Sequence, residues 1–231
     1  MPQVARFWNT IAEEFDSIYT GANKSGPSRF LDRFFRQDIY QRFDWVMEKS
    51  GDVRGKTICD IGCGSGRFVT EFAKRGAAHV TGVDVAPDML KLAKGLVERG
   101  GVADKCDFEL NDVLNWKTDQ KFDVAIAIGF WDYIQNPPER LRLIRNLTKE
   151  TFFSAWPRFW TWRMPVRKVR LQYIRGCPVY FFRKRQVFQM LEGAGFQVVD
   201  CQTIGKLFCV EARVKNPSGS SPGKQRPQTR Q

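Results

Sequence analysis

Residues 59–68 read Cys-Asp-Ile-Gly-Cys-Gly-Ser-Gly-Arg-Phe, and this stretch decides the fold. It overlaps the apolar run Thr57–Ile61 and leads into a run in which Phe68, Phe72 and Ala73 recur at helical spacing. A glycine-rich turn between a strand and a helix lets a ligand approach main-chain N–H groups at the carboxyl edge of a parallel sheet. The stretch therefore predicts a nucleotide-binding βαβ unit.

The spacing of the glycines and of the next acidic residue indicates the kind of nucleotide. A second apolar run ends in Asp84, eighteen residues after Gly66, where a carboxylate can accept hydrogen bonds from both hydroxyls of a ribose. A dinucleotide fingerprint would require Gly-x-Gly-x-x-Gly, but counting from Gly62 places Arg67 at the last position. The pattern therefore disfavours a pyrophosphate ligand.

Apolar or β-branched runs alternate with helix-period stretches along most of the chain, which is typical of a parallel sheet with crossover helices. We expect seven strands, over 57–61, 79–84, 107–110, 123–128, 151–156, 197–200 and 207–214. Only a few residues around Gly205 separate the last two strands, so they must form an antiparallel hairpin. The predicted fold class is α/β: one Rossmann-like domain with a mostly parallel seven-stranded sheet, a closing β-hairpin and helices on both faces.

Length and composition agree with one globular domain. The chain has 231 residues, of which 42% are hydrophobic and 27% charged. It contains no apolar run of about 18 residues, and acidic residues occupy the N-terminal stretch where a signal peptide would be apolar. Its six cysteines show no paired CxxC spacing. We therefore expect a soluble cytoplasmic protein with reduced thiols and no zinc site.

The formal net charge of +12 is concentrated in two segments. Residues 158–186 hold nine Lys and Arg residues and no acid, and residues 215–231 hold four more, again without an acid. Subtracting these 13 from the 37 basic residues leaves 24 against 25 acidic ones, so the body is close to neutral. The second segment is rich in Pro, Gly, Ser and Gln, and we expect a disordered basic tail there.

Four motifs in order resemble those of the class I S-adenosylmethionine (SAM)-dependent methyltransferases. They are Asp60–Gly66, Gly82-Val83-Asp84, Asn111-Asp112-Val113 and the run 122–129. The resemblance is close over about residues 40–156 and extends through the hairpin to about 212. Residues 7–21 and 177–181 also resemble the small-molecule branch, which includes ubiquinone-biosynthesis and Mg-protoporphyrin methyltransferases.

The resemblance implies SAM as cofactor, with S-adenosylhomocysteine (SAH) as product. Asp60 would orient the methionine amine, Asp84 would bind the ribose and Asp112 would accept a hydrogen bond from the adenine amino group. Asp112 could instead be a plain turn residue, and Tyr19 could cap the cofactor or simply pack. The implied cofactor-binding set is Asp60, Gly62, Cys63, Gly64, Gly66, Asp84, Val85, Met89, Asn111, Asp112, Val113, Ile128, Gly129 and Tyr19.

Methyl transfer is an in-line displacement, so positioning and the exclusion of water can supply most of the catalysis. The single histidine, His79, begins a strand at the edge opposite the ligand, and no carboxylates cluster at the strand ends to hold a metal. Asp132 and Tyr133 are the catalytic candidates, as base or as substrate anchor. Alternatively, Asp132 caps the next helix and Tyr133 packs.

We expect residues 157–182 to form a basic, aromatic lid over an anionic metabolite, glycan or lipid-linked acceptor with an O or N nucleophile. The candidate substrate-binding residues are Trp131, Arg158, Trp160 and Arg163. The same segment would suit an anionic membrane surface, RNA, or a solvated face with core tryptophans.

The expected organisation is a helical cover over 1–36, the methyltransferase domain over 37–214 and the tail over 215–231. A SAM-binding regulatory or scaffold protein without catalysis is the alternative function, together with an RNA methyltransferase. Nucleic acid is the least favoured partner, because no RNA-binding module accompanies the domain.

Overall fold

The computed structural model describes residues 2–20, 37–159 and 177–215, without the side chains of residues 11, 13–20 and 37. The helices are α1 (Pro2–Thr20), α3 (Gln37–Lys49), α4 (Arg67–Lys74), α5 (Pro87–Arg99), α6 (Pro137–Leu147) and α8 (Lys184–Gly193), with 3-10 turns η1 (Ala103–Lys105) and η2 (Trp131–Tyr133). The strands are β1 (Thr57–Ile61), β2 (His79–Asp84), β3 (Cys106–Leu110), β4 (Phe122–Ile128), β5 (Thr148–Pro157), β6 (Phe196–Ile204) and β7 (Leu207–Val214).

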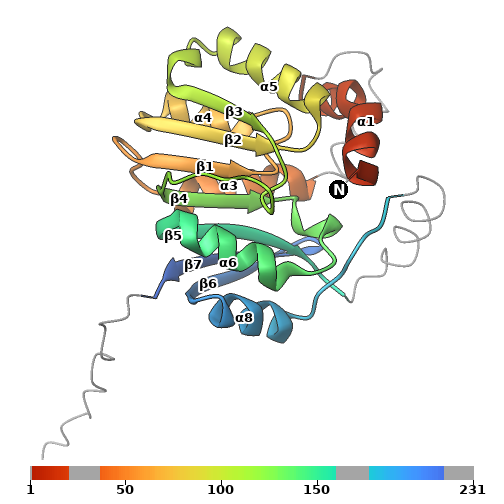
Figure 1. Ribbon diagram of the computed structural model, residues 1–231, viewed down its shortest axis with the longest axis vertical. Coiled ribbons are helices and arrows are strands. Elements are labelled where there is room, and N and C mark those ends of the chain that lie inside the picture. Colours follow the sequence, from red (N-terminus) through yellow and green to blue (C-terminus); the bar gives the residue numbers. More distant parts are fainter. Residues whose placement is uncertain (1, 21–36, 160–176, 216–231) are drawn as a thin grey trace, which may run out of the picture.

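The strands form one sheet in the order β3-β2-β1-β4-β5-β7-β6 (Figure 1). Strands β1 to β5 are parallel, and β7 lies antiparallel between β5 and β6. This confirms the predicted fold class, including the closing hairpin. The order reverses at β1, so the carboxyl ends of β1 and β4 flank the crevice in which open α/β sheets bind ligands.

Two strands are longer than their apolar runs predict. β5 begins at Thr148 and pairs Thr148 with Phe122 of β4, while the polar residues 149 and 150 remain exposed. β6 is an edge strand that continues to Ile204 through exposed polar residues, with a register shift after Val198. Backbone pairing, rather than side-chain burial, extends both strands, so hydrophobic patterning underestimates them.

Both faces of the sheet are covered. Ile58, Val124 and Phe153 pack in the core under α3, α4 and α5, whereas alternate residues such as Cys59 and Ala125 pack under α6 and α8. Burial of both faces explains why these strands are continuously apolar. Each fully buried large side chain stabilises the fold by about 1.5–3 kcal/mol.

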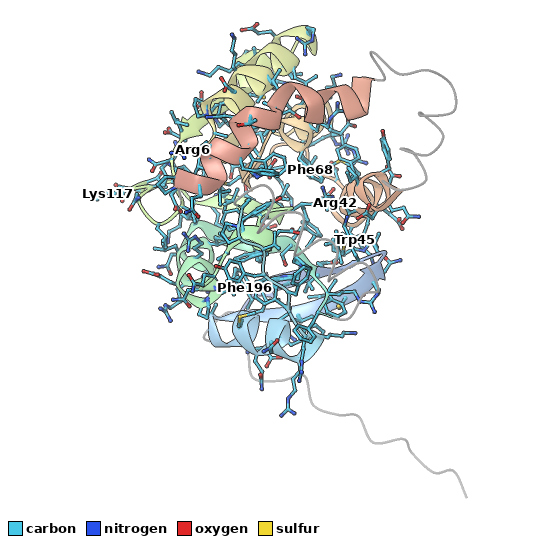
Figure 2. All side chains as sticks on the ribbon, turned by 90° about the vertical axis from the view of Figure 1, so that its right-hand side faces the viewer. Arg6, Arg42, Trp45, Phe68, Lys117 and Phe196 are labelled. Atoms are coloured by element: carbon cyan, nitrogen blue, oxygen red, sulfur yellow. The ribbon has the colours of Figure 1, made fainter. Side chains whose placement is uncertain are left out.

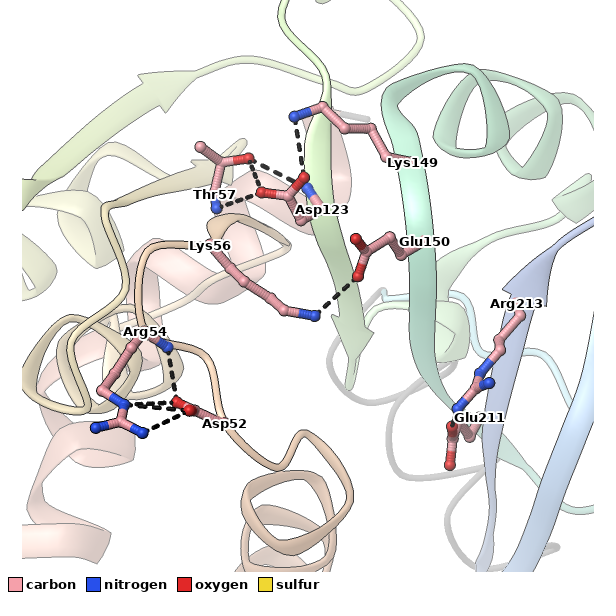
Figure 3. Close-up of polar contacts among 9 residues, drawn as sticks. All are labelled: Asp52, Arg54, Lys56, Thr57, Asp123, Lys149, Glu150, Glu211 and Arg213. Atoms are coloured by element: carbon pink, nitrogen blue, oxygen red, sulfur yellow. Dashed lines mark hydrogen bonds and ion pairs between the residues drawn. The ribbon is translucent and has the colours of Figure 1, made fainter.

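Polar contacts join the amino-terminal ends of three strands (Figure 3). The Asp123 carboxylate accepts hydrogen bonds from the N–H and hydroxyl of Thr57, both at 2.8 Å, and pairs with Lys149 at 3.0 Å. Lys56 pairs with Glu150 at 2.8 Å. Burial opposes ionisation of Asp123, but these hydrogen bonds outweigh it and lower its pKa. This network ties β1, β4 and β5 together at the edge remote from the crevice.

Helix α1 lies against α5 at the carboxyl edge (Figure 1). Ala12 packs with Ala86 and Met89, and the Asp88 N–H donates to Asn9 Oδ1 at 3.3 Å. This helix is the described part of the expected cover over 1–36; residues 21–36 lie outside the described residues. Across residues 2–20, 37–159 and 177–215, no helix is both long and apolar enough to cross a membrane.

The expected lid is described only at its two ends. Residues 160–176 lie outside the described residues, as does the expected tail from 216 onward. The flanking residues Arg158 and Phe182 form a parallel β-bridge, and the Tyr180 N–H donates to the Asp132 carbonyl at 2.8 Å. Both ends of the segment are therefore held beside β5 and η2.

Candidate active site

A cavity of about 230 Å³ opens at the carboxyl edge of the sheet. Figure 2 looks onto this edge, with Arg42 and Phe68 labelled near its middle. The walls of this cavity come from the ends of β1, β2 and β4, the loop after β3, helices α1, α3 and α4, and the β6–β7 turn. The predicted residues that line it are Gly62, Cys63, Gly64, Asp84, Val85, Met89, Asn111, Asp112, Val113, Ile128, Gly129, Asp132 and Tyr133.

The glycine loop after β1 requires glycine both for its backbone conformation and for its close packing against neighbouring residues. Gly62, Gly64 and Gly66 all have positive φ angles, of 74°, 53° and 76°. A Cβ on Gly62 would lie 3.0 Å from the Phe130 ring, beside the cavity. A Cβ on Gly66 would lie 2.7 Å from the Ala93 Cβ, so this glycine permits α4 to pack against α5. Gly66 starts α4 and does not line the cavity.

Asp84 is anchored to the loops around it. Its Oδ2 accepts a hydrogen bond from the Gly64 N–H and its Oδ1 from the Ala86 N–H, both at 2.9 Å. Burial raises the pKa of Asp84, and the N–H donors of Gly64, Ala86 and Val85 oppose that rise. A carboxylate is thus fixed on the glycine loop with its position set by the main chain.

Asp60 lies behind the loop and is 1% exposed. Its Oδ2 has no hydrogen-bond partner among the described residues. Burial and, secondarily, the charge of Asp84 raise the pKa of Asp60 to about 8. A buried carboxyl group without a partner is costly, and a cationic group bound at the loop would complete it.

The loop after β3 places three predicted residues beside Asp84. The Asn111 N–H donates to the Asp84 carbonyl at 2.9 Å. The Asp112 carboxylate accepts from the Leu114 N–H at 3.1 Å and from Arg140 at 3.2 Å. Asp112 therefore builds the turn and also lines the cavity, while its contact with the adenine amino group stays a prediction.

The catalytic candidates lie at the end of β4. Asp132 is 3% exposed. Burial of the Cys177 thiol, together with the negative charge of Asp132, raises the pKa of that thiol to about 11. Tyr133 packs edge-to-face with Trp8 of α1, at 5.7 Å between ring centroids. The N-cap of α6 is Asn136 rather than Asp132, so the alternative role of Asp132 as a helix cap is not observed.

Two predicted substrate residues do not line the cavity. Trp131 is fully buried and stacks on Trp156 at 4.1 Å, so its ring belongs to the core. Arg158 donates to the Gly205 carbonyl at 3.1 Å and lies over the Phe208 ring, so it braces the β6–β7 turn. Strand-end position alone did not reveal which way these side chains point.

Three of the predicted residues cannot be placed. Trp160 and Arg163 lie outside the described residues, as does the side chain of Tyr19.

Charged residues from α3 and the β6–β7 turn also line the cavity, and sequence analysis missed them. A Cβ at Gly129 would lie 3.6 Å from both terminal nitrogens of Arg42. Asp38 is 9% exposed and lies 3.1 Å from the Lys206 ammonium. No local pattern distinguishes these residues from other surface charges. Only the packing of α3 and the turn brings them to the end of β4.

Comparison with known proteins agrees with this geometry. Residues 52–156 match a family model described as a methyltransferase domain. The ubiquinone biosynthesis O-methyltransferase of Aeromonas salmonicida is 33% identical over 108 residues, which are 47% of this chain and 45% of that protein. The ubiquinone biosynthesis O-methyltransferase of Neisseria meningitidis is 33% identical over 119 residues, which are 49% of this chain and 49% of that protein. The chain thus spans about half the length of these relatives.

Solved structures extend the likeness of fold. Magnesium protoporphyrin IX methyltransferase from Synechocystis PCC 6803, with bound SAH, superposes with a TM-score of 0.75 at 19% identity, covering 92% of this chain and 98% of that one. The [4+2]-cyclase SpnF superposes with a TM-score of 0.68 at 15% identity, covering 92% and 96%. The same fold therefore carries different reactions.

Residues 52–156 match the methyltransferase domain family, and the order of the seven strands is the one that the resemblance to class I, SAM-dependent methyltransferases predicts. This confirms the resemblance expected from residues 60–129.

Proposed function

We propose that this protein transfers a methyl group from SAM to an O or N nucleophile of a small acceptor. The observation that carries the proposal is that Asp84 and the glycine loop line one cavity at the carboxyl edge, with the buried Asp60 behind that loop and outside the lining. When bound, SAM supplies an electrophilic methyl group on a sulfonium.

The residues present fit each part of that cofactor. The Asp60 Oδ2, which has no hydrogen-bond partner among the described residues, suits the ammonium of the methionine moiety, and Arg42, beside Gly129, suits its carboxylate. Asp84 suits the ribose hydroxyls, and Asp112 suits the adenine amino group. Each of these charged side chains would thus face a ligand group of complementary charge or hydrogen-bonding capacity.

One side of the cavity carries residues that can exclude water and accept a proton. Trp8 and Tyr133 close one side of the cavity with aromatic surface, and the Asp132 carboxylate lies in the same wall. Asp132 or Tyr133 would accept the proton of a neutral nucleophile. The only histidine, His79, lies at the amino edge, 2.9 Å from Asp107, and is remote from this chemistry.

An anionic acceptor would fit the wall formed by α3 and the β6–β7 turn. Lys206 lines the cavity there, and Arg158 holds the turn by its bond to Gly205. The basic segment 158–186 begins at the same place. Once an acceptor is known, Lys206→Met should raise its KM at least about tenfold while leaving the KM for SAM within about twofold. Lys215→Met, an exposed change at the end of β7, is the matched control.

The basic segment also supports an encounter with anionic membranes, which would suit a lipid-linked acceptor. Vesicle flotation with and without anionic lipid tests this part of the proposal. Equal flotation in neutral and anionic vesicles would contradict an electrostatic association.

Calorimetric titration of the purified protein with SAH, beside a titration with NADH, tests the cofactor. Micromolar binding of SAH without binding of NADH is expected; the reverse would overturn the assignment of the glycine loop. Release of SAH from SAM in the presence of candidate acceptors then distinguishes an enzyme from a SAM-binding protein without catalysis.

A further inference from the structure

The ion pair between Arg140 and Asp112 differs from the other ion pairs among the described residues. The Arg140 Nη2 lies 3.2 Å from the Asp112 Oδ2, and the two side chains are only 9% and 11% exposed. In every other pair of described residues at least one partner is 33% exposed or more. This pair therefore carries a desolvation cost that the others largely avoid.

The pair connects the cavity to helix α6. Asp112 belongs to the loop between β3 and β4, which has no helix or strand of its own. This loop runs from β3 at one edge of the sheet to β4 at its middle, past β2 and β1. Arg140 belongs to the first turn of α6, and its hydrogen bond to Asp112 links this helix to the loop.

Asp112 already organises the loop without Arg140. Its carbonyl accepts hydrogen bonds from the N–H groups of Asn115 and Trp116, at 2.8 and 3.0 Å, and its Oδ1 accepts from Leu114. These bonds fix the main chain and one carboxylate oxygen. The bond from Arg140 adds a hold on the second oxygen, Oδ2, and so determines the rotation of the carboxylate in the cavity wall.

A buried ion pair is weak evidence of added stability, since an apolar pair of similar volume often stabilises as well. Arg140 is moreover incompletely satisfied, because its Nε has no hydrogen-bond partner among the described residues. The energetic cost of burying this pair is explained if the oriented carboxylate serves a ligand.

We propose that Arg140 is a positioning residue for nucleoside selection. It holds the Asp112 carboxylate in the orientation that accepts a hydrogen bond from an exocyclic amino group, and so favours a 6-aminopurine over a 6-oxopurine. A carboxylate offers only acceptors, so a carbonyl at the same position is repelled and leaves the site unpaired. This inference rests on the proposed function, because it takes the nucleoside of the cofactor as the ligand.

The test compares SAH with S-inosylhomocysteine, in which a carbonyl replaces the adenine amino group. Calorimetry on the full chain measures both dissociation constants for wild type, Arg140→Met, Arg140→Lys and Arg142→Met. Arg142 is the matched control, because it lies on the same helix, is exposed and is not among the residues lining this cavity.

We expect wild type to prefer SAH by about 100-fold or more. Arg140→Met should reduce that preference by about tenfold, Arg140→Lys should restore part of it, and Arg142→Met should leave it unchanged. In the double variant Asp112→Asn/Arg140→Met, the loss of preference for SAH should be smaller than the sum of the two single losses, because the two residues act as one unit.

The preference ratio separates positioning from mere support of the fold, since loosening of the whole cavity weakens both ligands alike. An unchanged ratio in Arg140→Met, in a protein that still binds SAH, overturns the inference and leaves the proposed function intact. If Arg140→Met does not fold, Arg140→Lys decides the question: an unchanged ratio there overturns the inference. Wild type that binds neither compound overturns the proposed function as well.

Discussion

The two ends of the central sheet treat their carboxylates in opposite ways. At the amino edge, Asp123 receives hydrogen bonds from Thr57 and Lys149, and these lower its pKa (Figure 3). At the carboxyl edge, burial raises the pKa of Asp60 to about 8 and also raises that of Asp84. The Asp123 carboxylate has its partners within the protein, whereas the Asp60 Oδ2 has no hydrogen-bond partner among the described residues.

The difference indicates which edge is functional. A charge that the chain pairs internally contributes to folding, but a buried carboxyl group left without a cation destabilises the free protein. Such a group is retained where a ligand supplies the missing partner. Substitutions at the two edges test this contrast.

Replacing Asp84 should affect ligand binding most. Asp84→Ala removes the carboxylate fixed on the glycine loop by the N–H groups of Gly64 and Ala86. We expect SAH binding to weaken by about 2 kcal/mol or more, measured by calorimetry. Asp123→Ala should leave the affinity within about twofold, since that carboxylate lies at the opposite edge. Equal losses in the two variants would remove the functional distinction between the edges.

Asp60→Asn should stabilise the ligand-free protein at pH 8. The folded-state pKa of about 8 lies above the usual 3.8, so the folded protein binds more protons than the unfolded chain between these values. Stability from this group is therefore present at low pH and is lost as the pH rises toward 8. We expect Asn to raise the free energy of unfolding at pH 8 by about 2 kcal/mol, measured with urea.

The same variant has an effect of opposite sign on binding. Since the ammonium of SAH favours ionised Asp60, wild-type affinity should increase from about pH 6 to pH 8. In Asp60→Asn that increase should be much smaller, and SAH should bind more weakly at pH 8. Identical pH profiles for the two proteins would show that Asp60 does not face the ammonium.

At the amino edge, removal of a partnered carboxylate should destabilise. Asp123→Ala leaves the Thr57 N–H and hydroxyl without their acceptor and should lower the free energy of unfolding by about 1–2 kcal/mol. Because the folded pKa of Asp123 is lowered, its contribution is present at neutral pH and is lost as the pH falls below the usual carboxyl range. Urea titrations at pH 7 and pH 3 would measure both effects.

The exposed ion pair between Arg54 and Asp52 should contribute least to the free energy of unfolding. Arg54 contacts Asp52 at 2.7 Å and lowers the pKa of that carboxyl to about 2, but the side chains are 79% and 62% exposed. Solvent screens such pairs. We therefore expect Arg54→Ala to leave the urea midpoint unchanged, and a clear loss would mean that the amino edge depends on its outermost charges as well.

Sequence alone predicted the sheet and most of the residues that line the cavity around the glycine loop. Parallel strands, the glycine loop and Asp84 are encoded by neighbouring residues, whose spacing reflects local backbone geometry. Predictions failed for two side chains, Trp131 after β4 and Arg158 after β5, whose residue types and strand-end positions suggested substrate contact. The structure instead buries one against Trp156 and turns the other to Gly205.

Local sequence therefore specifies the order of elements and the residues within a few positions of the glycine loop. The rest of the cavity depends on tertiary packing, which places Arg42 beside Gly129, Lys206 beside Asp38, and Arg140 behind Asp112. These partners are distant in sequence, and each pairing depends on how a helix packs against a loop or turn. Local patterns specify backbone conformation, but the direction of a side chain across an interface is set by packing between elements.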